Sequence, residues 1–213
     1  MSLARRTAEI TAALIGIVTT VVGVTTTVGA ILNPIDTASA HASPPATTVS
    51  SQMLETFKSS CYDLMPDLAA VEQYAANGGW TPVEGMALKT LAPESGSKSL
   101  KGWKLAASEG QAAMTIAVAV ADMEPEMAEA MSEFAGSDVN SCSVISGASA
   151  DHEQIAEAMR GLVGRAHDSV EDAGSLTSNV WAAVTPDIAV IMSHYRPKTG
   201  TGVNVLAMVT MTK

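Results

Sequence analysis

The feature that most constrains this chain is an uninterrupted apolar segment near its N-terminus. Residues 10–32 contain no charged side chain, follow Arg5 and Arg6, and precede the small residues of 38–42. A basic start, an apolar core and a small-residue cleavage site are the three parts of an export signal. The sequence therefore predicts that the rest of the chain is delivered across a membrane.

Two fates of this segment stay open. Its 23 residues would suffice for a helix that spans a bilayer, whereas a cleaved signal has an apolar core of about 7–15 residues. Threonine and glycine dilute the segment, however, and residues 38–40 and 40–42 both fit a signal peptidase, so we favour cleavage over an inner-membrane anchor. In both cases the domain lies in the periplasm or outside the cell, because Arg5 and Arg6 are the only basic residues before Lys58.

The chain divides accordingly into three parts. Residues 1–42 are predicted to be a signal peptide or signal anchor, residues 43–50 a linker, and residues 51–213 a single globular domain. Beyond residue 42 there are 10 basic and 20 acidic side chains, so a net charge of −10 is kept. An acidic surface repels nucleic acid, and no basic patch with interleaved aromatic residues occurs, so we expect no nucleic-acid partner.

Cys61 and Cys142 are the only two cysteines. An isolated pair in an exported protein indicates a disulfide. The pair is 81 positions apart, unlike the closely spaced cysteines of a redox motif, and two thiolates do not complete a metal site. We therefore predict a structural disulfide that joins the first helix to a strand.

Hydrophobic periodicity predicts an α+β domain. Apolar residues at helical spacing indicate three or four helices, at 51–64, 66–76, 125–135 and 151–163. Alternating or continuous apolar runs indicate five or six strands, at 103–107, 112–121, 140–146, 179–184, 187–195 and 203–212. Short links join the last three runs and predict an antiparallel meander. Residues 79–102 are predicted to be a partly irregular loop, with a short strand near 86–90.

Three short motifs resemble the signature set of serine β-lactamases and penicillin-binding proteins. They are Ser95-Gly-Ser-Lys98, Ser137-Asp-Val-Asn140 and Lys198-Thr-Gly200, in that order along the chain. The resemblance implies an acyl-transfer enzyme with Ser95 as nucleophile and Lys98 as its proton partner. Against it, the first motif has the composition of a turn instead of a helix start, and the second carries an extra residue. We keep this enzyme as an alternative only.

Met123, Met127 and Met131 lie one helical turn apart among acidic residues. Thioethers at this spacing can bind Cu(I) outside the cytoplasm, which gives a second alternative function. The last two also share a helical stripe with Ala130 and Phe134, which is typical of a buried core face. We favour the core interpretation.

The histidines are His41, His152, His167 and His194. A zinc site could gather the last three, but no His-x3-His spacing supports it. His194 alternates with Val190 and Met192, so it is predicted to share their face of the sheet. We interpret the histidines as surface or core residues and assign no metal.

Four short patterns resemble those of a group of small exported alphaproteobacterial proteins with no assigned function. They are Phe57-x3-Cys61, Gly79-Trp80, Asn140-Ser-Cys142-Ser-Val144 and Trp181, over roughly residues 54–184. The resemblance implies a Gram-negative periplasmic setting and supplies no catalytic residue.

The sequence thus predicts an exported, non-catalytic domain that binds a protein partner or a small ligand. Cys61 and Cys142 are the only site residues that we assign, with no catalytic residue and no cofactor.

Overall fold

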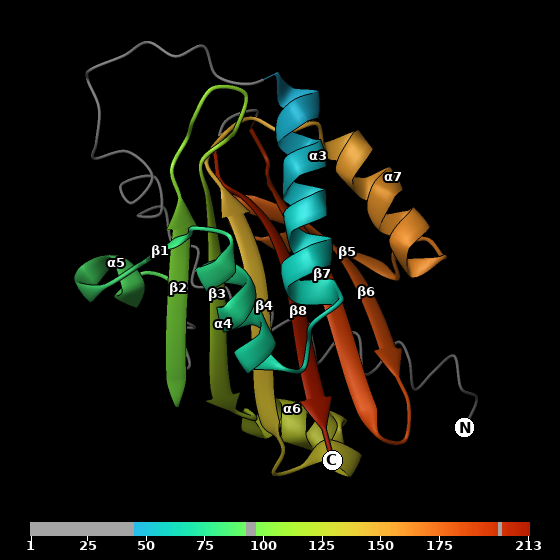
Figure 1. The fold of residues 1–213 in the computed structure, drawn as a ribbon. Coiled ribbons are helices and arrows are strands. Elements are labelled where there is room, and N and C mark those ends of the chain that lie inside the picture. The colour runs from blue at the N-terminus through green and yellow to red at the C-terminus, as the bar shows by residue number, and fades with distance from the viewer. Residues whose placement is uncertain (1–44, 93–96, 200–201) are drawn as a thin grey trace.

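The computed structural model describes residues 45–92, 97–199 and 202–213, which form an eight-stranded antiparallel sheet with helices packed on it (Figure 1). The predicted export segment at 10–32 lies outside these ranges. Within them, no helix combines the length and the apolar character needed to cross a membrane.

The elements follow one another in a simple order. They are α3 (Ala46–Phe57), the π-helical turn η1 (Lys58–Tyr62), α4 (Leu68–Asn77), β1 (Thr81–Pro82), α5 (Gly85–Lys89), β2 (Ser99–Leu105), β3 (Met114–Asp122), α6 (Pro125–Ala130), the 3₁₀ turn η2 (Ser132–Phe134), β4 (Asp138–Ser146), α7 (His152–Val163), β5 (Ser169–Ala173), β6 (Leu176–Val184), β7 (Ile188–Pro197) and β8 (Asn204–Thr212). In space the strands are ordered β1-β2-β3-β4-β8-β7-β6-β5. The chain therefore builds one half of the sheet, passes through α7 to the far edge, and returns strand by strand until β8 pairs with β4.

Successive side chains of a strand point to opposite faces, so the sheet has two apolar faces. The helix face lies under α3, α4 and α7, which Figure 1 shows on one side of the sheet. Its strand residues include Ile116, Cys142, Met192, Leu206 and Met208. The second face combines small side chains with large ones such as Ile191, Tyr195 and Met211; the small ones include Ala117, Ala189, Val205, Ala207 and Val209. Among the described residues outside the strands, those that pack on the second face are Val203 and residues of the β1–β2 connection with α5 and of the α6–η2 region.

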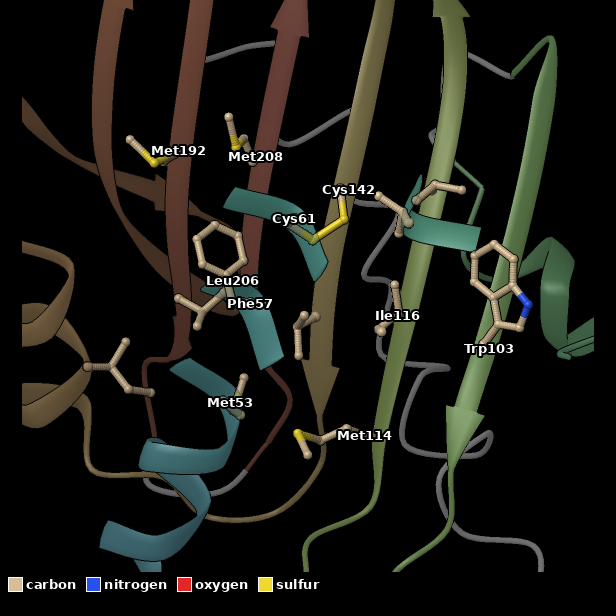
Figure 2. Packing of buried hydrophobic residues seen from close by; sticks show 14 of the residues in the cluster. Met53, Phe57, Cys61, Trp103, Met114, Ile116, Cys142, Met192, Leu206 and Met208 are labelled. Atoms are coloured by element: carbon tan, nitrogen blue, oxygen red, sulfur yellow. A yellow bond between two sulfur atoms is a disulfide. The ribbon is translucent and has the colours of Figure 1, made fainter. Parts of the chain in front are cut away.

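A single stripe attaches α3 to the helix face. Val49, Met53, Phe57 and Cys61 recur every four residues and have no solvent exposure. In η1 the Asp63 N–H donates to the Lys58 carbonyl at 2.9 Å, five residues back, which widens the turn. The extra residue of the π turn lets Ser60 and Cys61 both be buried. Figure 2 shows the outcome, with Phe57 over Leu206 and Cys61 bonded to Cys142.

The predicted α+β class, the antiparallel sheet and the final meander of β6, β7 and β8 are confirmed. The predicted number of five or six strands was wrong, because the sheet has eight. The two additional strands are its edges. β1 has two residues, one of them Pro82, and β5 carries Glu171 and Asp172. Short and charged edge strands discourage unwanted pairing, but they also lack an apolar pattern.

The bounds of several elements and the type of one also differ from the prediction; β2, for example, starts at Ser99, within the predicted loop. Residues 46–50, predicted as part of the linker, form the first turn of α3, because Pro45 starts the helix and Val49 and Ser50 are buried. The short strand predicted near 86–90 is the helix α5 instead. Leu91, just after α5, packs on β2 at Gly102, where a Cβ atom would come within 2.9 Å of the Leu91 Cδ1. This close packing depends on the absence of a Cβ atom at Gly102. A glycine adds nothing to a hydrophobic pattern, so nothing in the sequence indicates the contact.

Candidate functional site

The predicted Cys61–Cys142 disulfide is present and joins η1 to β4. The two Cα atoms are 5.5 Å apart, which is an ordinary distance for a disulfide. Both residues have no solvent exposure and lie in the helix-face core (Figure 2). Cys142 pairs with Val118 on one side and Met208 on the other, so the bond reaches the middle of the sheet. The bond is compatible with an oxidising, exported location.

The proposed acyl-transfer motifs do not form one site among the described residues. Ser95 lies outside them. Lys98 Nζ lies 2.6 Å from Asp122 Oδ1 and 2.7 Å from Asp138 Oδ1. The hydrogen bonds that Lys98 donates to Asp122 and Asp138 raise its pKa to about 12 and keep its amine protonated. A general base must accept a proton, so this environment does not suit the role that the resemblance gives Lys98.

Lys198 lies elsewhere in the sheet. Its Nζ is 2.5 Å from Asp172 Oδ2 on the edge strand β5. Lys98 precedes β2 on the opposite half of the sheet. β4 starts at the end of the sheet where β8 ends and β7 begins. Lys198 follows the end of β7, so it lies at the opposite end. The structure therefore brings Lys98 to Asp138 of the second motif and separates both from Lys198.

The methionine stripe is core. Met127 and Met131 are 1% and 2% exposed, and Met123 packs partly buried against the same cluster. Phe134 of η2 lies in this cluster too, so the predicted stripe continues beyond the end of α6. These contacts confirm the core interpretation of Met127 and Met131.

The structure brings two of the predicted histidines together and leaves the third apart. The rings of His152 and His194 have centroids 5.7 Å apart, with an angle of 38° between their planes. His167 is exposed and lies edge-on to Trp181, with 6.0 Å between centroids. Within the described ranges, no group of three or more His, Cys, Asp or Glu residues could hold a metal ion.

The histidine pair is electrostatically unusual. Burial, then His152 and Arg196, lower the pKa of His194 to about 3. Burial and Arg196 also lower the pKa of His152, and Asp151 acts in the opposite direction. Both ring nitrogens of His194 and Nδ1 of His152 are buried without a hydrogen-bond partner in the structure. Both rings are therefore neutral at pH 7, and His194 stays neutral well into the acid range.

A second polar group lies on the second face. Ser178 in β6 pairs with Tyr195 in β7, and Ser193 is the preceding β7 residue on the same face. All three are at most 2% exposed. Burial raises the pKa of Tyr195, and the nearby hydroxyls of Ser193 and Ser178 oppose that rise. The Tyr195 hydroxyl nevertheless makes no well-aligned hydrogen bond. An unpaired hydroxyl on an otherwise apolar face is a candidate contact for a ligand.

Sequence reasoning missed both polar groups. The alternation in β7 placed His194 on its face correctly, but the contact with His152 depends on how α7 crosses the sheet. Ser193 directly follows the apolar run of residues 188–192, which was the available signal for a polar group on the second face. Searches with this chain find no matching family model, no matching curated protein and no matching solved structure.

Proposed function

We propose that this protein is an exported, non-catalytic domain of the periplasm or cell exterior that binds a protein partner or a small, mostly apolar ligand. The main support is the buried Cys61–Cys142 disulfide, because such a bond persists only where thiols are oxidised. The apolar segment at 10–32 and the resemblance to exported alphaproteobacterial proteins agree with this compartment. If the segment is retained, it anchors the domain in the inner membrane.

The second face is where we place the binding site. Its residues, Ala207 and Tyr195 among them, are almost fully buried, so a ligand would lie in the interior beside the Tyr195 hydroxyl, which makes no well-aligned hydrogen bond. Small-molecule sites typically combine an apolar lining with a few polar groups. The ligand chemistry that fits is therefore an apolar body with a single hydrogen-bonding group.

Titration with a neutral apolar dye, N-phenyl-1-naphthylamine, tests the binding site on the secreted protein. We expect saturable fluorescence enhancement that Tyr195→Phe weakens about fivefold, the equivalent of one hydrogen bond of ~1 kcal/mol. Tyr62→Phe is the matched control, because the Tyr62 hydroxyl donates to the Leu162 carbonyl at 3.4 Å on the helix side. Absence of saturable binding, or an equal effect of both variants, would contradict this location.

A covalent penicillin-type probe tests the non-catalytic part of the proposal. We expect no labelling of the secreted protein. Labelling that Ser95→Ala abolishes would overturn the proposal in favour of the acyl-transfer alternative.

A further inference from the structure

The contact between His152 and His194 lies where α7 meets the sheet. His194 is on the helix face of β7, where its partners in the neighbouring strands are Asn179 and Leu206. His152 is the first residue of α7. The ring centroids are 5.7 Å apart, so the start of α7 covers His194 directly.

The surroundings of this pair provide little compensation for a positive charge. His194 is fully buried, and neither ring nitrogen has a hydrogen-bond partner. The charged groups that act on the pair are Arg196 on the same strand and Asp151 at the start of α7. β6 and β8 place no ionisable residue opposite His194. The only carboxylate of α3, Glu55, acts on Tyr74. A buried charge without a partner is strongly unfavourable, so protonation and burial of His194 oppose each other.

α7 is attached by few groups. Ile155 and Met159 are its buried residues, and most of its other side chains are exposed or half-buried. At its start, the Asp151 N–H donates to Ser50 Oγ at 2.6 Å. An amphipathic helix with one buried stripe is the kind of element that opens locally before the rest of a domain unfolds.

We propose that the His152–His194 contact is an acid-sensitive latch, in which proton uptake by the pair releases α7 from the sheet. This inference is independent of the proposed binding function. It applies to any compartment whose pH falls below the ordinary range of histidine, as the space outside the inner membrane does when the surroundings become acidic.

Proton linkage determines the direction and size of the effect. The closed state lowers the pKa of His194 to about 3, whereas an exposed histidine has its ordinary value near 6.5. Below pH 6.5 the open state therefore binds more protons than the closed state. For each unit by which the pH falls, the equilibrium constant for opening of α7 therefore rises by up to about tenfold for each such histidine. This rise ends near pH 3.

Hydrogen exchange of the secreted full chain between pH 7.5 and 5 tests this proposal. We expect the protection factors of α7 amides to lie below those of β4 and β8 at each pH, and to fall about thirtyfold between pH 7.5 and 5, which is the linkage of one proton between a pKa near 6.5 in the open state and one of about 3 in the closed state. His194→Phe should abolish most of the fall. His167→Gln is the matched control and should leave it unchanged, because His167 is exposed. Protection factors of α7 amides equal to those of the central strands, which would mean that α7 opens only when the whole domain unfolds, or an unchanged fall in His194→Phe, would overturn the latch.

A measurement on the unmodified protein covers the case in which His194→Phe does not fold. The imidazole proton resonances of each histidine can be followed by NMR against pH. We expect His194 to remain neutral as long as α7 is closed. Titration of His194 near pH 6.5 with α7 still protected would overturn the proposal.

Discussion

Phe57 and Met86 are large apolar residues with opposite environments. Phe57 has no solvent exposure and packs between α3 and the sheet, whereas Met86 in α5 is 73% exposed. We expect Phe57→Ala to lower the free energy of unfolding by about 3–5 kcal/mol, because it removes buried surface and leaves a cavity. Met86→Ala should change it by less than about 0.5 kcal/mol. Urea denaturation measures both, and similar costs for the two variants would contradict the described core.

At the same scale, sequence periodicity predicted which side chains are buried better than it predicted what they touch. The α3 stripe through Met53, Phe57 and Cys61 follows from helical spacing, and the face of His194 follows from strand alternation. The contacts of Lys98 with Asp122 and Asp138 could not be predicted, because they join residues from three segments. They depend on strand register, which no local pattern specifies.

Among the elements, α7 has a start that is capped by a side chain. The Asp151 side chain accepts a hydrogen bond from the Gln154 N–H at 3.0 Å. We expect Asp151→Ala to destabilise the domain by about 1 kcal/mol, since one buried helix donor loses its partner. Asp151→Asn keeps a capping oxygen and should cost clearly less, which separates the cap from the charge. Thermal unfolding of both variants is the measurement, and equal losses would show that the cap does not matter.

The elements that were predicted and those that were missed differ in a simple physical way. The helices α3, α4, α6 and α7 each bury an apolar stripe, so periodicity indicates them. The edge strands β1 and β5 are stabilised by backbone pairing with β2 and β6, and their side chains need no pattern. The tendency of residues 46–50 to form helix was hidden by a Pro-, Ser- and Thr-rich composition.

For the molecule as a whole, we expect acid to destabilise the fold. His194 and His152 have lowered pKa values, so the folded state binds fewer protons than the unfolded chain below pH 6.5. The free energy of unfolding should therefore fall as the pH drops from about 6.5 towards 3, by about 1.4 kcal/mol per pH unit at most for one proton. Asp168 adds to the loss below pH 3.8. Burial works to raise its pKa, but hydrogen bonds from Arg165 and the Ala182 N–H lower it overall.

Urea denaturation at pH 7, 6 and 5 measures this dependence. His194→Phe should make the curve flatter over that interval, and His167→Gln should not. A free energy of unfolding that is constant or rises as the pH falls would contradict the described environment of the pair.

The disulfide also acts on the whole molecule. It joins cysteines with a sequence separation of 81, and the chain-entropy model then gives about 4.5 kcal/mol of stabilisation. We expect the Cys61→Ala and Cys142→Ala double variant to lose about this amount in urea denaturation. A loss below about 1 kcal/mol would show that the bond contributes little to the fold.

The central claim is that a disulfide formed after export joins the first helical layer to the middle of the sheet. Mass spectrometry of the full-length gene product, recovered from the exported fraction and alkylated without reduction, tests this claim most directly. We expect no alkylated cysteine and a linked pair of peptides containing Cys61 and Cys142. Recovery of both cysteines as alkylated thiols would contradict it.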